Sequence, residues 1–214
     1  GGPYHEVPKG FAWSGSTEGL ASYGLGDMVR DVLALADHLG IETFDCVGFS
    51  MGGMIAQHLA ICAPTRLKRL VSLSSTAGTA DLTADALSLW HMERFFLPFA
   101  SLADKETAIL ESNDHFSVGL MPASDPQSRK FAETLAARGQ DKGGYLRHAL
   151  AITTCPSWRE QLLDITMPAL IIHGDADPCI NDTDARNLAA RLPHATFLGR
   201  PGLGHWIDDA TGHC

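Results

Sequence analysis

The 214-residue sequence has no apolar run near the length of about 20 residues that a membrane-spanning helix needs. It also has few basic residues, because 16 Lys and Arg stand against 25 Asp and Glu, which gives a net charge of −9. This charge disfavours nucleic acid and anionic membranes as partners. The opening segment GGPYHEVPKG has no basic stretch followed by an apolar one, so we expect no signal peptide.

Cysteine is scarce and widely spaced. No two Cys form a CxxC pair and their number is odd, which disfavours a disulfide framework and a zinc site. The five are Cys46, Cys62, Cys155, Cys179 and Cys214. We therefore expect a protein of the reducing cytoplasm that holds no metal.

Short apolar segments alternate with helical ones along much of the chain. Residues 1–24 are rich in Gly, Pro and Ser and are expected to form a loop. Helices are expected from Leu25 to Gly40 and over residues 51–62 and 182–192, and strands over 43–47, 69–74, 169–173 and 195–198. Strands that alternate with helices predict an α/β fold with a mostly parallel sheet.

Residues 77–166 differ from the rest because they show helical patterns and little strand signal. Their clearest helices are expected at 85–96 and 128–139. We interpret this segment as a helical insertion between a core formed by residues 1–76 and 167–214. Its aromatic side chains could face an apolar substrate or could pack the insertion itself; they are Trp90, Phe95, Phe96, Phe99 and Phe116.

The segment Gly48–Gly52, GFSMG, matches the pattern G-x-S-x-G between an expected strand and an expected helix. A sharp turn there holds the Ser in strained geometry, and its flanking glycines let the chain approach closely. The Ser50 hydroxyl would stand at the positive end of the helix, where the Met51 N–H could stabilise an oxyanion. The alternative is a tight turn in which Ser50 caps the helix.

A nucleophilic Ser needs a base and a carboxylate that orients the base. His205 lies in a Gly-rich turn, GLGHW, just after the last expected strand, where a loop His has no packing role. His173 ends the preceding strand and is expected to pack or hydrogen-bond there. His58 lies on the apolar helix and is expected to be a satisfied core residue.

Two carboxylates follow the third expected strand, in the segment HGDADP. Both lie at the carboxyl edge of the sheet, where the sites of open α/β sheets are found. Asp177, whose loop direction Pro178 fixes, is the candidate acid, and Asp175 is its competitor as a turn former. Asp182 and Asp184 are expected to cap the next helix.

The segments GFSMGG, HGDADP and GLGHW, in this order, resemble the motifs of the α/β-hydrolase superfamily. The resemblance implies that Ser50 is the nucleophile, Asp177 the acid and His205 the base, with a helical cap at 77–166. It implies no cofactor, and it is strongest to carboxylesterases, such as the methylesterases of aromatic polyketide pathways, so the expected partner is a small-molecule ester. Phe49 and Trp206, next to Ser50 and His205 in sequence, are candidates for substrate contact.

The chain also departs from the superfamily pattern. The superfamily has four further strands before the helix that corresponds to the one expected from Leu25. One of these strands leads to a loop that supplies the second oxyanion donor. The superfamily also has a helix after the catalytic His. Gly1-Gly2-Pro3 resembles a remnant of that loop only weakly. We therefore expect an N- and C-terminally truncated core that forms a homo-oligomer or associates with a missing N-terminal segment.

Three functions follow from this pattern. The first is hydrolysis of a carboxylic ester through an acyl-enzyme. The second is a catalytically dead fragment, or a binding protein on the same scaffold. The third is a C–C bond hydrolase, which would use the same triad. A haloalkane dehalogenase is disfavoured because it needs a carboxylate in place of Ser50.

Overall fold

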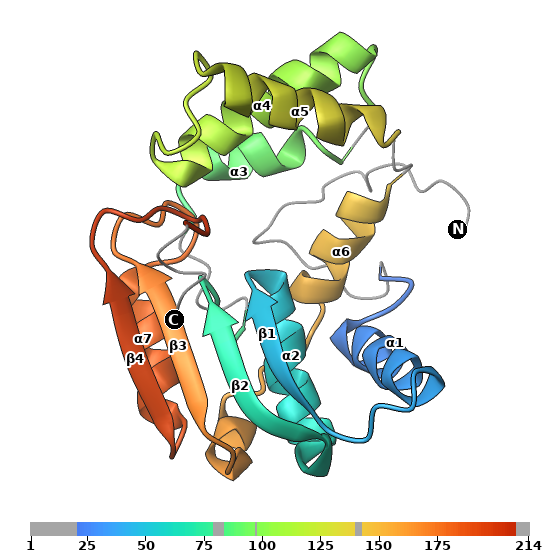
Figure 1. Cartoon of the computed structure of the whole chain (residues 1–214), viewed down its shortest axis with the longest axis vertical. Coiled ribbons are helices and arrows are strands. Elements are labelled where there is room, and N and C mark those ends of the chain that lie inside the picture. Colours follow the sequence, from blue (N-terminus) through green and yellow to red (C-terminus); the bar gives the residue numbers. More distant parts are fainter. Residues whose placement is uncertain (1–20, 79–83, 97, 140–142, 209–214) are drawn as a thin grey trace.

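The computed structural model describes residues 21–78, 84–96, 98–139 and 143–208. Figure 1 shows a sheet whose strands all point toward a separate group of helices. Of the loop expected at residues 1–24, all but residues 21–24 lies outside the described residues. None of the described helices is long and apolar enough to cross a membrane.

Four parallel strands form the described sheet and lie side by side in sequence order: β1 (Phe44–Phe49), β2 (Leu67–Leu73), β3 (Ala169–Gly174) and β4 (Ala195–Arg200). Leu73 of β2 lies opposite Phe49 of β1 and Ile172 of β3. The carboxyl ends of the strands therefore meet at one edge of the sheet. The expected parallel α/β sheet is confirmed, with strand bounds that differ by at most two residues from those expected.

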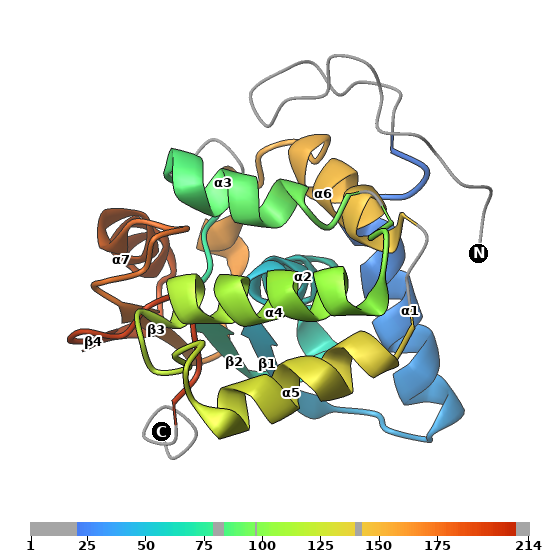
Figure 2. The same ribbon diagram turned by 90° about the horizontal axis from the view of Figure 1, so that it is seen from above.

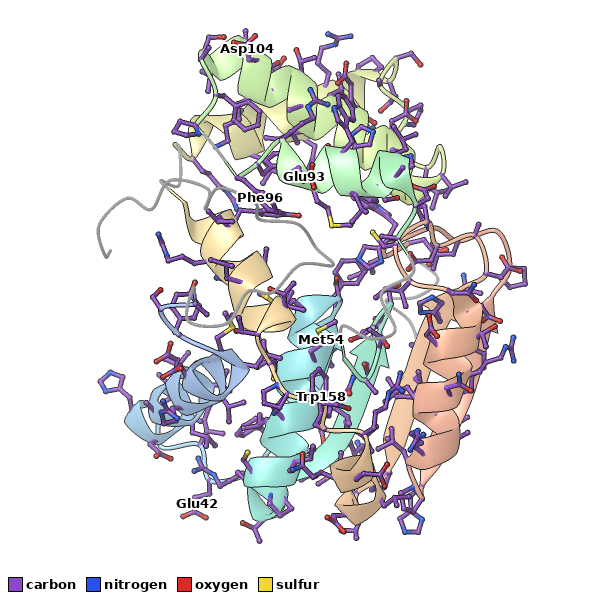
Figure 3. The ribbon with its side chains drawn as sticks, turned by 180° about the vertical axis from the view of Figure 1, so that it is seen from behind. Glu42, Met54, Glu93, Phe96, Asp104 and Trp158 are labelled. Carbon is purple, nitrogen blue, oxygen red and sulfur yellow. The ribbon has the colours of Figure 1, made fainter. Side chains whose placement is uncertain are left out.

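Helices α2 (Met51–Cys62) and α7 (Asp182–Arg191) pack on one face of this sheet, α2 against β1 and β2 and α7 against β3 and β4. They lie behind the strands in Figure 1 and in front of them in Figure 3. Helix α1 (Leu25–His38) packs against α2, and Gly40, with a φ of +69°, follows its end. Gly adopts this left-handed backbone without a steric penalty, so Gly40 ends the helix as expected.

Four more helices, α3 (Ala86–Glu93), α4 (Leu102–Ser117), α5 (Pro126–Ala137) and α6 (Gly144–Thr153), lie beyond the carboxyl edge of the sheet. In the view from above in Figure 2, α4 crosses over α2. The side chains of Asp85, Ser101 and Asp125 accept the backbone N–H groups that begin α3, α4 and α5. Helix α3 is shorter than the expected helix over 85–96, because Asp85 is its cap and the chain turns after Glu93.

The cap of α7 is Asn181, whose side chain accepts the Thr183 N–H at 2.8 Å. The expectation that Asp182 and Asp184 cap this helix is therefore wrong. Both acids stand instead in its first turn, where negative charge complements the helix dipole.

Gln57 and Trp158 form a buried polar pair in the core around α2. Gln57 of α2 is fully buried, and its side-chain oxygen accepts the indole N–H of Trp158 at 2.9 Å. Its side-chain nitrogen donates to the Thr76 carbonyl at 3.2 Å. Leu59 and Leu70 are also completely buried, and burial of each such side chain stabilises the fold by about 1.5–3 kcal/mol. The satisfied pair and its apolar surroundings fix α2, shown with Trp158 in Figure 3, on the sheet.

Candidate active site

Ser50 lies in the turn between β1 and α2 with φ +54° and ψ −120°, a conformation that a non-Gly residue rarely adopts. Such strain costs on the order of 1–3 kcal/mol and persists only where the surroundings hold it. The Ser50 N–H donates to the Leu73 carbonyl at 2.9 Å, which holds the turn to β2. The Ser50 side chain makes no capping hydrogen bond, so the alternative of a capping Ser is wrong.

Two glycines around Ser50 are sterically required, and one of them, Gly53, lies outside the G-x-S-x-G motif. A Cβ on Gly48 would stand 2.1 Å from the Gly52 carbonyl oxygen. A Cβ on Gly53 would stand 2.6 Å from the Cβ of Ser75. A Cβ on Gly52 would meet no atom within 4 Å. The tight approach that we expected at the flanking glycines is therefore real at Gly48 and Gly53 and absent at Gly52.

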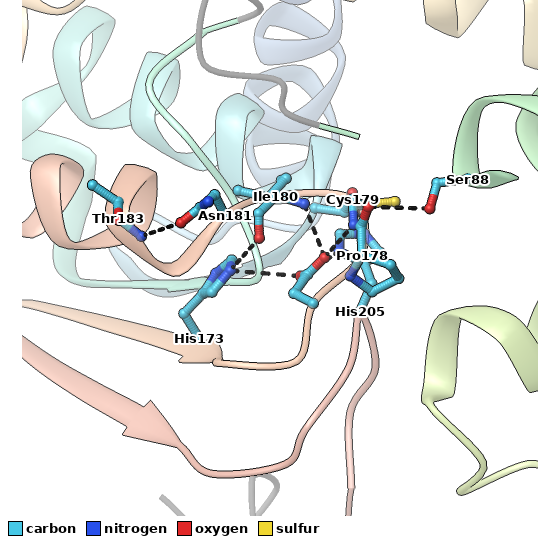
Figure 4. Close-up of polar contacts among 10 residues, drawn as sticks. Ser88, His173, Pro178, Cys179, Ile180, Asn181, Thr183 and His205 are labelled. Atoms are coloured by element: carbon cyan, nitrogen blue, oxygen red, sulfur yellow. Dashed lines mark hydrogen bonds and ion pairs between the residues drawn. The ribbon is translucent and has the colours of Figure 1, made fainter. Parts of the chain in front are cut away.

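Asp177 lies in the loop after β3, and its side chain is fully buried. Its Oδ1 atom accepts the backbone N–H groups of Cys179 and Ile180 at 2.8 and 2.9 Å. Its Oδ2 atom lies 2.7 Å from His205 Nδ1. Figure 4 shows this loop, whose Pro178 carbonyl accepts a hydrogen bond at 3.1 Å from the hydroxyl of Ser88 on α3. The Asp177 carboxylate is therefore held in one orientation, with Oδ2 aimed at the His205 ring.

His205 lies in the loop after β4 and completes a continuous chain of hydrogen bonds. Its Nδ1 faces Asp177, and its Nε2 lies 2.9 Å from the Ser50 hydroxyl. Its ring also packs against Phe49, with the ring centroids 4.9 Å apart. The structure thus brings His205 together with Asp177, 28 residues away in sequence, and with Ser50, 155 residues away.

Tight backbone contacts position the loop that carries His205. A Cβ on Gly174 would stand 1.9 Å from the Leu203 carbonyl oxygen, and one on Gly204 would stand 2.3 Å from the Phe116 carbonyl oxygen. Gly174 therefore lets the His205 loop approach β3, and Gly204 lets it approach the end of α4. Sequence reasoning missed this packing role, although the glycine directly before His205 was its visible signal.

The competing candidates lie elsewhere. His173 is completely buried, with Nε2 2.9 Å from the Ile180 carbonyl and 3.6 Å from Asp177 Oδ2. Asp175 is exposed, and its carboxylate accepts the Gly202 N–H at 2.6 Å, which joins the loops after β3 and β4. His58 is half-buried against the Trp158 ring, and burial lowers its pKa. None of the three lies at the Ser50 hydroxyl, although His58 is less buried than the core position expected for it.

Met51 is the first residue of α2, and its N–H has no acceptor among the residues that the structure describes. The first N–H groups of a helix have no partner within the helix, so this one is available to an oxyanion. The expected remnant of a second donor, Gly1-Gly2-Pro3, lies outside the described residues.

A cavity of about 640 Å³ lies between the carboxyl edge of the sheet and helices α3 and α6, and Ser50 and His205 line it. Phe49 also lines it, whereas the other candidate for substrate contact, Trp206, does not. None of the five aromatic residues singled out in the insertion lines it either. Phe95 packs against Phe99 instead, with ring centroids 5.4 Å apart, whereas half of the Trp90 surface is exposed and the Phe116 ring lies 6.3 Å from the His205 ring.

Within the described chain, one group of side chains has the spacing to hold a metal ion: Asp177, Cys179 and His205, whose ligand atoms lie within 4.8 Å of one another. Burial, the Asp177 carboxylate and Asp85 all raise the pKa of the Cys179 thiol. The thiol therefore stays protonated, whereas a metal binds the thiolate. The other two side chains already hydrogen-bond each other, so this group fits a metal poorly.

Comparison with known proteins places these features in a family context. A family model of the alpha/beta hydrolase fold matches residues 8–208. The chain is 28% identical over 183 residues to 3-oxoadipate enol-lactonase 2 of Acinetobacter baylyi, a match that covers 85% of this chain and 64% of that protein. It is 26% identical over 204 residues to rhodomycin D methylesterase of a Streptomyces species, covering 87% of this chain and 68% of that protein.

The fold agrees with solved structures. A hydrolase from Pseudomonas aeruginosa PA01 superposes with a TM-score of 0.67 at 26% identity, over 86% of this chain and 65% of that one. The relatives at this level of identity include esterases, lactonases and a semialdehyde hydrolase. The chain spans about two thirds of the length of these relatives.

Proposed function

The chain belongs to the alpha/beta hydrolase fold family, and from that premise we propose that it is a serine hydrolase of carboxylic esters. The observation that carries the proposal is the unbroken line of hydrogen bonds from Ser50 through His205 to Asp177. A Ser hydroxyl is a weak nucleophile by itself, and this arrangement supplies the base and the carboxylate that activate it.

In the proposed reaction, Ser50 Oγ attacks the ester carbonyl while His205 Nε2 accepts its proton. Asp177 keeps the other imidazole proton on Nδ1 and stabilises the imidazolium. The Met51 N–H donates to the oxyanion of the tetrahedral intermediate. His205 then gives its proton to the leaving alcohol, which departs and leaves an acyl group on Ser50.

Hydrolysis of the acyl-enzyme reverses these roles. A water molecule enters where the alcohol left, and His205 accepts one of its protons as the oxygen attacks the acyl carbonyl. The second tetrahedral intermediate collapses to a carboxylic acid, and the proton returns from His205 to Ser50 Oγ. The overall reaction consumes one ester and one water and yields one acid and one alcohol.

Hydrolysis of 4-nitrophenyl butyrate by the purified chain tests this proposal. We expect turnover that Ser50→Ala and His205→Ala each lower by at least about a thousandfold. His194→Ala is the matched control, because His194 is exposed and its side chain lies outside the described cavity. Turnover that survives Ser50→Ala would refute the proposal.

The same triad could cleave a C–C bond, a possibility favoured by a 27% identical relative, 2-hydroxymuconate semialdehyde hydrolase. The two activities separate when kcat/KM for the ester is compared with kcat/KM for a diketone whose carbon–carbon bond is scissile. The ester proposal expects the ester to be the better substrate, and the reverse order would favour the C–C hydrolase. A folded chain that cleaves neither would be the non-catalytic binding protein.

A further inference from the structure

The cavity above Ser50 is apolar in most of its lining, with side chains such as Met54, Leu89, Met92 and Ile152. Its described lining includes one carboxylate, that of Glu93, and neither a Lys nor an Arg. Glu93 lies on α3, above Met54 of α2 in Figure 3. A charged group at the wall of a cavity acts on the charge of a ligand that the cavity holds, with a strength that depends on its exposure to solvent.

Glu93 does not stabilise its own helix. It is the last residue of α3, where the helix dipole is negative and a carboxylate is unfavourable. The neighbouring Arg94 pairs with Glu111 at 2.7 Å and stacks over the Trp90 ring at 4.5 Å. In the part of the chain that the structure describes, Glu93 itself forms no ion pair. Its negative charge is therefore available to a ligand.

We propose that Glu93 makes this cavity selective for esters that carry a cationic group, an alkylammonium above all, and that it disfavours esters that carry a carboxylate. The inference rests on the proposed function, because it names the substrate class of the same site. Glu93 is exposed at the cavity wall, so solvent screens its charge. The effect of one such interaction is therefore about fivefold in affinity.

The test compares three ligands of one chain length: hexylammonium, hexan-1-ol and hexanoate. Calorimetric titration into the Ser50→Ala chain measures binding without turnover. We expect hexylammonium to bind about fivefold more tightly than hexan-1-ol and hexanoate about fivefold more weakly, with both ratios shrinking as salt is added. If hexylammonium does not bind more tightly than hexan-1-ol, the inference is overturned.

The role of Glu93 is tested by Glu93→Gln, which keeps the size of the side chain and removes its charge. The three affinities should then converge, while that of hexan-1-ol stays within about twofold of its former value. Glu133→Gln, on the exposed face of α5 away from the cavity, is the matched control and should preserve the original order. A preference for the cation that survives Glu93→Gln contradicts the inference.

The same ligands, used as competitive inhibitors of 4-nitrophenyl butyrate hydrolysis by the wild-type chain, separate this inference from the proposed function. This ester is neutral and gives Glu93 no charge to act on, and the control Glu133→Gln, which lies outside the cavity, should change its kcat/KM by less than about twofold. Loss of all ester hydrolysis with an intact charge order in binding would refute the proposed function alone. Normal hydrolysis of 4-nitrophenyl butyrate, with equal inhibition by hexylammonium, hexan-1-ol and hexanoate, would refute the selectivity for cations and leave the proposed function intact.

Discussion

Asp177→Asn removes one negative charge and changes almost nothing else in the site. The two backbone N–H groups at 2.8 and 2.9 Å can still donate to the Asn carbonyl oxygen. The amide NH₂ would then face His205 Nδ1 across the present 2.7 Å contact, where it needs an acceptor. The imidazole of His205 would then adopt the tautomer with its proton on Nε2. In that tautomer Nε2 could no longer accept the proton of Ser50.

The expected loss in kcat is about 10³–10⁴-fold, which is what a misplaced tautomer costs a serine-protease triad. At about 1.36 kcal/mol per decade, this corresponds to about 4–5.5 kcal/mol of transition-state stabilisation. The melting temperature should change little, because the backbone donors keep an acceptor. Asp177→Ala should lower the melting temperature as well, because each unsatisfied N–H costs about 1–3 kcal/mol.

The assay is the steady-state rate of 4-nitrophenyl butyrate hydrolysis, with a thermal melt of each variant. Asp175→Asn is the matched control, because Asp175 lies two residues away in the same loop, is exposed and uses its carboxylate to accept the Gly202 N–H, not to contact His205. It should lose no more than about fivefold. An Asp177→Asn variant that keeps more than a tenth of wild-type kcat would refute the tautomer argument.

Two further predictions concern stability. Gly53→Ala should lower the free energy of unfolding by about 1–3 kcal/mol, because its new Cβ would stand 2.6 Å from Ser75 Cβ. Gly52→Ala should not lower it, because a Cβ there would meet no atom within 4 Å. Equal melting temperatures for these two variants would contradict the steric account. Burial lowers the pKa of His58, so the unfolded chain takes up a proton more readily than the folded chain does. Stability should therefore fall as pH drops from about 7 to about 5, and the fall should be smaller in His58→Gln, as melts across this range would show. An equal or larger fall in that variant would contradict the shift.

The positions of the three candidate catalytic residues could be predicted because each lies in the segment that follows a strand. Ser50, Asp177 and His205 come after β1, β3 and β4, and parallel strands end at the same edge of a sheet. Apolar segment lengths and glycine positions are enough to find such strands. The 28 residues between Asp177 and His205 and the 155 residues between Ser50 and His205 do not prevent the prediction, because the sheet brings the three loops together.

Contacts between the helical group and the sheet could not be predicted. The contact between Gly204 and the Phe116 carbonyl depends on how α4 docks, which no local pattern encodes. The position of Glu93 at the cavity could not be predicted either. A helix was expected there, but the sequence did not indicate which side of it faces the cavity. The five aromatics of the insertion suggested a substrate surface, yet none of them lines the described cavity.

The cap of α7 shows a smaller ambiguity of the same kind. The segment Asn181-Asp182-Thr183-Asp184 holds four residues in a row that can cap a helix. Local propensity does not choose among them. The choice follows from β3 and the loop after it, where Asp177 accepts the Cys179 and Ile180 N–H groups and so fixes the residue at which α7 begins.

Labelling with a fluorophosphonate tests the central claim, an activated Ser50, most directly. The reagent reacts with a Ser whose proton a neighbouring base accepts, and it needs no knowledge of the natural ester. Intact-mass measurement should show one adduct per wild-type chain, with the modified peptide containing Ser50, and none in Ser50→Ala. A folded wild-type chain that stays unlabelled, or that is labelled at another Ser, would contradict the account.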